Sequence, residues 1–463
     1  SVFQNLFHPV RPLLYCGKMG HFVWNIVRDL NFFLVAIFMI EQLPGNELFH
    51  ETFRKIIIAV MVAVMMWRLF GHLFFESSPV GGARVGGPLR QKKTEGGKSQ
   101  KLEWAVCEMQ GWRAAMEDAT CIVASLPEPL AEQALFAVFD GHGGSQVSHI
   151  ASKEFPKVLQ VCANKLQDSA TETQKEEMQS NLDISGPCTP GTSSSSKPKE
   201  LEEDDKCRLS NNGVEADIAL KAEGGLSGKS LSMSMIAMDA FLRQLGNGLN
   251  SKRNGIPLSS PLGIVARHLE ANRQKNAFNL IGSTAIVALV DCRGSTRTVT
   301  VANCGDSRAV LCRAGKAIEL SEDHKPELES EENRIRLAGG SVKLIGPCHR
   351  IDGWGLNLSR ALGDFHYKAR ADLSAEEQKV IAVPEIRTVQ LDDDDEFLVL
   401  ACDGCFELHS SQDVIDIVHG ALRAGVDVQQ AAEQLVDKSC SPNLVKTRGK
   451  GGDNCSAIVI KFR

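Results

Sequence analysis

The stretch "FAVFDGHGGSQVSHIASKEF", residues 136–155, joins an apolar, strand-like run to a helical pattern through a glycine-rich loop. Asp140 ends the run, and His142 lies among the three glycines that follow it. Because glycine lets a backbone and a ligand approach each other closely, the loop is a candidate ligand site. A plain strand-to-helix turn, with Asp as the turn former, explains the same residues. Carboxylates at other strand ends would favour the ligand site.

The composition is that of a globular protein with material for a large core. The chain has 463 residues, a length that suggests roughly two to three domains, and 43% of them are hydrophobic. A net charge of −6 does not indicate nucleic-acid binding. Fourteen irregularly spaced cysteines indicate reduced thiols in an intracellular compartment. Cys402 and Cys405 form a C-x-x-C pair, but Asp403 between them would raise the thiol pKa, which argues against a redox or zinc site.

Residues 1–75 differ in composition from the rest of the chain. They contain a short apolar run at 31–40 and a longer one at 55–75, which is long enough to cross a bilayer core of about 30 Å as a helix. Arg68 in the second run is tolerable near a helix end, where its side chain can reach the interface. We therefore expect a hydrophobic helical segment that associates with a membrane through residues 31–75, with one span, two or none. A helical hairpin packed on the rest of the protein is the alternative.

Residues 76–101 are rich in Gly, Lys and Arg, which predicts a flexible basic linker. Basic residues next to a membrane segment favour the cytosolic side. The expected location is thus a membrane, with the rest of the chain facing the cytosol, and otherwise the cytoplasm.

Residues 102–463 show many short strand patterns and five helical patterns. Strands are predicted at 103–109, 120–126, 134–140, 283–291, 296–304, 307–320, 396–403 and 456–462. Helices are predicted at 145–162, 233–245, 329–338, 410–423 and 427–439. Consecutive strands with helices arriving in pairs favour an α+β fold with an antiparallel two-sheet core and helices outside. A polar, low-complexity stretch at about 165–230 is predicted to be a disordered insertion.

Carboxylates recur beside glycine where the predicted strands end. Besides Asp140, these acidic residues are Glu117, Asp118, Asp306, Asp364, Asp403, Glu407 and Asp453. Clustered carboxylates repel one another unless cations compensate them, and ligation by oxygen alone suits Mg²⁺ or Mn²⁺. Two such ions about 3.5–4 Å apart would activate a bridging water for in-line attack on phosphorus. The guanidinium of Arg113 matches a phosphate group, and His142 is placed to protonate the departing oxygen. The residues alone thus predict a metal-dependent phosphoester hydrolase.

Seven motifs, in this order, resemble those of the metal-dependent protein serine/threonine phosphatases, the PPM or type 2C family. They are "GWRAAMEDA" at 111–119, "VFDGHGG" at 138–144, "GSTA" at 282–285, "ANCGDSRAV" at 302–310, "LSRALGDF" at 358–365, "ACDG" at 401–404 and "GDNCSAIVI" at 452–460. The resemblance spans about 102–463, interrupted by the insertion. It implies a four-layer α-β-β-α sandwich, with two central antiparallel sheets flanked by helix pairs.

The resemblance also implies roles for individual residues. Asp140 would bridge two Mg²⁺ or Mn²⁺ ions, and the Gly141 carbonyl would be a further ligand. Asp403 and Asp453 would hold one ion, while Glu117 would help on the other through water. Arg113 would clamp the substrate phosphate and His142 would be the general acid. Supporting positions would be Asp118, Thr284, Asp364 and Asn454.

Asp306 matches a family position that contributes to a third, weaker metal site. Its usual companion is an Asp four residues after the Asp of the "DG" pair, whereas this chain reads "DGCFE" and has Glu407 there. The side chain of Glu407 keeps the charge with one more methylene. The resemblance therefore leaves the affinity of the third site open, while every position of the two-metal core is filled.

The sequence predicts an enzyme of signal transduction that dephosphorylates serine and threonine in phosphoproteins. The catalytic domain is expected to be monomeric and to bind no nucleic acid. Two other functions stay open: an inactive phosphatase-like scaffold that binds phosphoproteins, and a hydrolase of small phosphoesters. The filled acidic positions argue against the scaffold, and a comparison of phosphopeptides with phosphorylated metabolites would separate the two hydrolases.

Overall fold

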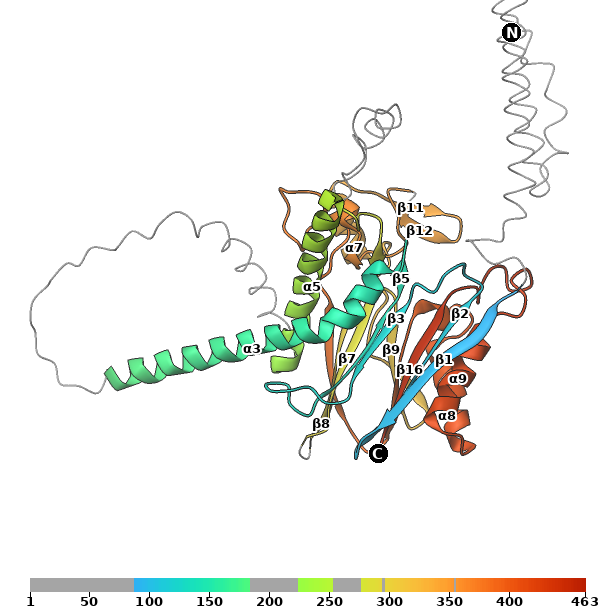
Figure 1. The fold of residues 1–463 in the computed structure, drawn as a ribbon, viewed down its shortest axis with the longest axis horizontal. Helices are drawn as coiled ribbons and strands as arrows, with labels where there is room; N and C mark the ends of the chain where they lie inside the picture. Colours follow the sequence, from blue (N-terminus) through green and yellow to red (C-terminus); the bar gives the residue numbers. More distant parts are fainter. Residues whose placement is uncertain (1–86, 184–223, 253–275, 294–295, 354) are drawn as a thin grey trace, which may run out of the picture. The chain divides into compact units, whose positions relative to one another are not determined.

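The structure is a computed structural model that describes residues 87–183, 224–252, 276–293, 296–353 and 355–463. The predicted hydrophobic segment at 1–75 lies outside these residues. Within the described part of the chain, no helix has the length and apolar character needed to span a membrane. The architecture of this part is α+β with several antiparallel sheets, as the sequence predicts (Figure 1).

A six-stranded antiparallel sheet has the strand order β1-β2-β16-β15-β9-β10. Its strands are β1 (Leu89–Lys98), β2 (Leu102–Gly111), β9 (Arg308–Arg313), β10 (Lys316–Glu319), β15 (Asp395–Ala401) and β16 (Cys455–Phe462). The helices α8 (Ser411–Arg423) and α9 (Val428–Ser439) pack against it. Ser410 and Asp427 cap these helices, because their side chains accept hydrogen bonds from Asp413 N and Gln430 N.

A five-stranded antiparallel sheet has the order β14-β8-β7-β4-β3. Its strands are β3 (Ala119–Val123), β4 (Ala134–Phe139), β7 (Ala285–Asp291), β8 (Arg297–Cys304) and β14 (Glu385–Leu391). The long helices α3 (Gln146–Asp183) and α5 (Gly225–Lys252) pack on this sheet and on each other. In Figure 1 they lie on the opposite side of the strands from α8 and α9.

The side chains of β4 show how the strands divide the core. Phe136 and Val138 belong to the cluster that joins the two sheets, and Trp104 of β2 meets the Phe136 ring edge-on at 5.8 Å. Leu135 and Phe139 belong to a second cluster with the α3 and α5 side chains. Because successive strand residues point to opposite faces, an unbroken apolar strand is buried on both. The end of β4 therefore lies in the middle of the fold.

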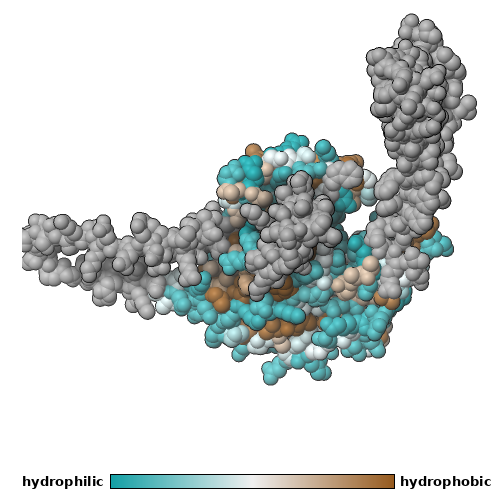
Figure 2. All heavy atoms as spheres, turned by 45° about the horizontal axis from the view of Figure 1, so that its top comes forward, coloured by the Kyte–Doolittle hydropathy of each residue, from teal (hydrophilic) through white to brown (hydrophobic). Residues whose placement is uncertain are grey.

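Short elements around this end complete the site. Three two-residue strands pair in the order β13-β6-β5, comprising β5 (Gly141–His142), β6 (Gly282–Ser283) and β13 (Leu362–Gly363). The remaining elements are α7 (Glu329–Leu337), the hairpin β11 (Val342–Ile345) and β12 (Cys348–Ile351), and the 3₁₀ turns η2 (Phe365–Lys368) and η3 (Asp403–Cys405). On the face seen in Figure 2, most of the described surface is hydrophilic, and apolar side chains form smaller separate groups.

The structure corrects two predicted segment boundaries. The flexible linker at 76–101 is wrong for Leu89–Lys98, which forms β1 at the edge of the six-stranded sheet. The side chains of Arg90 and Lys92 fix this strand, because Arg90 donates to Cys440 O at 2.9 Å and Lys92 pairs with Asp437 of α9. The disordered insertion at about 165–230 is wrong at both ends, since α3 continues to Asp183 and α5 begins at Gly225. Residues 171–183 contain Glu, Gln, Lys and Met, which favour helix even without packing.

Candidate active site

Three acidic residues converge because the ends of β4 and β15 and the start of β16 lie at the same place. Asp140 follows β4, η3 begins at Asp403 after β15, and Asp453 lies two residues before β16. The pairing of Ala401 with Ala457 sets the end of β15 beside the start of β16. The charges of Asp403 and Asp453 both act on Asp140, so the three carboxylates share one site. The fold therefore brings these three acids near one another, and metal binding by them stays a prediction.

The loop after β4 needs glycine at Gly141. A Cβ atom there would lie 2.2 Å from Glu117 O and 2.7 Å from Ser148 Oγ. Thr284 N donates to Asp140 O at 2.9 Å, and Asp140 N donates to Thr284 Oγ1 at 3.3 Å. Thr284 thus holds both the N–H and the carbonyl group of Asp140, the residue that follows β4.

The carboxylates of the site outnumber the positive side chains that contact them, Arg113 and Lys325. Burial raises the pKa of Asp140 well above its usual value, and the charges of Asp118 and Asp403 raise it further. The pKa of Asp403 is also far above its usual value, through burial and the charges of Asp306 and Asp453. Burial raises the pKa of Asp453 too, despite the opposing charge of Arg113. Such a group of acids would be stabilised by bound cations.

The Asp118 side chain is buried, and only one of its two carboxylate oxygens has a hydrogen-bond partner. Its Oδ2 accepts a hydrogen bond from Ser456 Oγ at 2.7 Å, whereas its Oδ1 is buried without a partner. Burial raises the pKa of Asp118 to about 7, and the charge of Asp453 adds to this effect. Ligand atoms of Asp118, Asp140 and Cys402 lie within 4.8 Å of one another. The orphaned oxygen and the oxygen-rich cluster fit a hard divalent cation.

Arg113 and Glu117 lie on the loop that leads to β3. The guanidinium of Arg113 hydrogen-bonds Asp453 and is 45% exposed, so it can also contact a ligand from solvent. Burial by itself would lower the pKa of Arg113, but the charge and hydrogen bond of Asp453, together with the charges of Asp403 and Asp140, raise it. Asn454 holds the loop, since its Oδ1 accepts from Glu117 N at 2.9 Å and its Nδ2 donates to Ala115 O at 3.0 Å.

His142 is paired with Asp364. The His142 Nε2 lies 2.6 Å from Asp364 Oδ2, and the Asp364 side chain is 1% exposed. Burial by itself would lower the pKa of His142, but the charge and hydrogen bond of Asp364 outweigh it and raise the pKa. Asp364 adopts a left-handed backbone with φ of +51°, which is uncommon for a residue other than glycine. Strain of this kind is typical of functional sites.

Comparison with known proteins decides the family. The family model of protein phosphatase 2C matches residues 102–200 and 263–447. The chain is 31% identical over 383 residues to probable protein phosphatase 2C 21 of Arabidopsis thaliana, covering 82% of this chain and 93% of the relative. The chain belongs to the protein phosphatase 2C family. Probable protein phosphatase 2C 6 of Paramecium tetraurelia is also 31% identical, and the match covers 81% of this chain and 98% of the relative.

A solved structure supports the fold of this protein phosphatase 2C. The serine-threonine phosphatase 2C of Toxoplasma gondii superposes with a TM-score of 0.54 at 19% identity, over 81% of this chain and 99% of that chain. The family membership makes the chain a metal-dependent protein serine/threonine phosphatase, as its motifs predicted.

The residues expected at the third metal site have protein partners in this phosphatase. Asp306 pairs with the ammonium of Lys325, and its side chain is 3% exposed. Glu407 Oε2 accepts hydrogen bonds from Gly451 N at 2.6 Å and Gly452 N at 3.0 Å. Metal binding by Asp306 and Glu407 stays a prediction.

Sequence reasoning missed several residues that complete the site. Lys325 supplies a positive charge to Asp306, Ser456 supports Asp118, and Ser307 lies 2.8 Å from the Thr284 hydroxyl through its own Oγ. Cys402 was read only as half of a C-x-x-C pair, yet its sulfur lies beside Asp118 and Asp140. The hydrogen bond between the Cys402 and Cys405 side chains, together with burial, keeps the pKa of Cys402 well above its usual value, as expected of a thiol that takes no part in redox chemistry. The thiols of Cys402 and Cys405 form no disulfide with each other.

Proposed function

We propose that this phosphatase hydrolyses phosphoserine and phosphothreonine by direct attack of a water molecule at a site that holds two Mg²⁺ or Mn²⁺ ions. The observation that carries the proposal is the group of buried carboxylates whose charges raise one another's pKa values. An acid cluster of this kind is costly for the protein unless divalent cations bind it.

The residues that would hold the metal ions are those of the two-metal core. Asp140 would be a ligand of both ions. The Gly141 carbonyl and a water held by Glu117 would be further ligands of one ion, and Asp403 and Asp453 would be ligands of the other. The ions would lower the pKa of a shared water and neutralise the phosphate oxygens. Asp306 and Glu407 are candidates for a third, weaker ion. The unsatisfied Oδ1 of Asp118 supports metal binding nearby.

Arg113 and His142 act on the substrate itself. Arg113 is exposed enough to bind the phosphate with two parallel hydrogen bonds while Asp453 orients the guanidinium. His142 donates a proton to the departing serine or threonine oxygen, a role that the upward shift of its pKa beside Asp364 supports. Asp364 fixes the ring through its hydrogen bond. Thr284 holds the backbone that presents Asp140.

We further propose the finer organisation of the chain. The two larger sheets and the helices on their outer faces form a four-layer α-β-β-α sandwich, supported by the separate core clusters on the two faces of β4. Residues 31–75 associate with a membrane and place a monomeric catalytic domain on its cytosolic side, supported by their apolar runs. Fractionation of the full chain tests the anchor: recovery in the soluble fraction at low salt would contradict it.

A single assay tests the catalytic proposal. The full chain is given a phosphothreonine peptide with Mn²⁺, with Mn²⁺ plus excess chelator, and as the Asp140→Asn variant. We expect hydrolysis in the first case alone. Inert wild-type protein with millimolar Mn²⁺ would favour the phosphoprotein-binding scaffold. Faster turnover of phosphorylated metabolites than of the peptide would favour the small-phosphoester hydrolase.

A further inference from the structure

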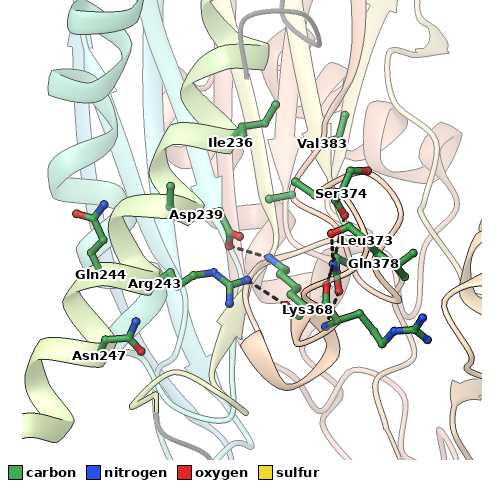
Figure 3. A pocket seen from close by; sticks show the side chains of 14 residues that line it. Ile236, Asp239, Arg243, Gln244, Asn247, Lys368, Leu373, Ser374, Gln378 and Val383 are labelled. Carbon is green, nitrogen blue, oxygen red and sulfur yellow. Dashed lines mark hydrogen bonds and ion pairs between the residues drawn. The ribbon is translucent and has the colours of Figure 1, made fainter. Parts of the chain in front are cut away.

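A cleft outside the acidic site lies between α5 and residues 368–383 (Figure 3). It has a volume of about 470 Å³. One face of α5 forms its first wall, with Ile236 and Asp239 buried at the base and Gln244 exposed at the rim. On the opposite wall Ala375 is exposed. The cleft is therefore open to solvent and has a mixed apolar and polar lining, as binding sites have.

The wall opposite α5 is held in place by the buried side chain of Gln378. Its Nε2 donates to Arg370 O at 2.7 Å and to Leu373 O at 3.0 Å, and its Oε1 accepts from Arg370 N at 3.2 Å. One amide group thus closes the turn that carries Leu373 and Ser374 into the cleft. A preformed wall loses little entropy when a ligand binds.

Arg243 gives the cleft a positive charge without a matching acid. Its guanidinium stacks 4.3 Å from the centre of the Phe365 ring, and Nη2 donates to Lys368 O at 3.3 Å. No carboxylate among the described residues forms an ion pair with it. Lys368 differs, because Asp239 Oδ1 lies 2.7 Å from its ammonium (Figure 3). Most donors of the Arg243 fork are therefore available to a ligand.

The acids on the neighbouring turn already have other partners. Asp372 pairs with Arg370, and Glu377 Oε2 accepts from Ser374 N at 2.9 Å. Neither Asp372 nor Glu377 lines the cleft. A planar guanidinium that is stacked and unpaired matches an incoming carboxylate in a bidentate arrangement.

We propose that this cleft docks a short acidic segment of the phosphoprotein substrate, with a Glu or Asp carboxylate on Arg243. A neighbouring apolar side chain of the segment packs on Ile236, Leu373 and Val383. The proposal rests on the proposed function for the identity of the substrate. The base of the cleft is connected to the catalytic region, because Asp239 accepts from Gly363 N at 2.8 Å and Gly363 precedes Asp364.

Peptide binding tests the docking site without catalysis. A fluorescent, unphosphorylated peptide of Leu and Glu is titrated with the full chain in chelator, and a second peptide replaces each Glu by Gln. We expect the Glu peptide to bind at least about tenfold more tightly, and Arg243→Gln to remove the difference. Arg423→Gln, which removes the same charge from an exposed position of α8, is the control and should leave the difference between the two peptides unchanged. Equal binding of both peptides, or equal loss in both variants, overturns the proposal.

A second variant and a kinetic test cover a folding defect of Arg243→Gln. Ala375→Glu puts a like charge at the rim and should weaken binding of the Glu peptide, while hydrolysis of a small aryl phosphate stays unchanged. With phosphothreonine peptides that carry Glu or Gln beside the phosphorylated residue, Arg243→Gln should raise KM about tenfold for the Glu peptide alone, at unchanged kcat. Hydrolysis of both peptides with equal KM would refute the docking site and would not affect the proposed phosphatase function. Selective binding of the Glu peptide without any hydrolysis would support the docking site and refute the phosphatase function.

Discussion

Buried acids occur in two regions of this protein with opposite electrostatic settings. Glu331 of α7 has a side chain that is 1% exposed, and it lies 2.7 Å from Arg360 Nη2 and 2.8 Å from Arg334 Nη1. Burial alone would raise the pKa of Glu331, but the hydrogen bond and charge of Arg360, with the charge of Arg334, lower it to about 2. In the acidic site, the pKa values of Asp140 and Asp403 move upward.

The difference separates a structural acid from a functional one. The protein supplies two cations for Glu331, so that carboxylate stabilises the fold as an ion. For the cluster around Asp140 it supplies Arg113 and Lys325, which leaves an excess of negative charge for metal ions to compensate. The source of the counter-charge, rather than burial, distinguishes the two regions.

The largest expected effect comes from Asp403→Asn. This change should lower metal-dependent hydrolysis by at least about a thousandfold, because it removes a metal ligand. It should also raise the melting temperature of the metal-free protein, since it removes one of the mutually repelling charges. Phosphopeptide turnover and calorimetry measure the two effects. If the variant kept a tenth of the wild-type rate, the assignment of Asp403 as a metal ligand would be wrong.

Glu331→Gln should lower the stability of the protein, in contrast to Asp403→Asn. It leaves Arg334 and Arg360 without their buried counter-charge, so the free energy of unfolding should fall by about 3–5 kcal/mol. Urea unfolding with chelator and with Mg²⁺ should give the same loss. Glu332→Gln, which breaks an exposed pair with Arg336, is the matched control and should change stability by less than about 1 kcal/mol. Equal effects of the two changes would contradict the structural role of Glu331.

The pH dependence of the metal-free protein sharpens the contrast. Because the folded pKa of Asp118 is about 7 and its usual value is 3.8, the folded state binds more protons between these values. Stability from this group is therefore present below about pH 4 and is lost as pH rises toward 7. We expect Asp118→Asn to become more stable than wild type by a few kcal/mol across this window. Thermal unfolding at pH 5 and 7.5 in chelator measures the difference, and an offset independent of pH would exclude this mechanism.

The smallest expected effect is that of Lys325→Met. It removes the partner of Asp306 and should destabilise the metal-free protein by about 1–2 kcal/mol. Lys316→Met, at an exposed position of β10, is the control and should be near neutral. Urea unfolding at pH 8 measures both. Equal stability of the two variants would show that Lys325 does not compensate the acidic site.

Strands and helices are predicted correctly from the sequence where the local pattern of apolar residues matches the burial of those residues in the fold. β4 is apolar throughout, and β7 and β16 are mostly apolar, so length and β-branched residues identify them. The carboxylates that follow such strands, among them Asp140 and Asp403, are recognisable for the same reason. The helices α8 and α9 are recognisable from their apolar faces.

The features that were missed depend on distant partners. β1 has no apolar residue after Leu89 and forms a strand because β2 offers it a free edge. The sequence predicts β8 at 296–304 but misses its partner β14 and the hairpin of β11 and β12, because polar residues interrupt the apolar residues of these short strands. The contact of Ser456 with Asp118 joins residues 338 positions apart, and no local period signals it.

The strand β1 determines where this enzyme can be shortened. The family model begins at residue 102, yet a Cβ at Gly97 would lie 2.6 Å from the Trp104 ring, so β1 covers that indole closely. A fragment that starts at residue 102 would leave one edge of β2 unpaired, while its other edge still pairs with β16, and would leave the indole uncovered. Open strand edges promote association between chains. Limited proteolysis should therefore release a core that stays monomeric and does not aggregate only when cleavage falls before Leu89.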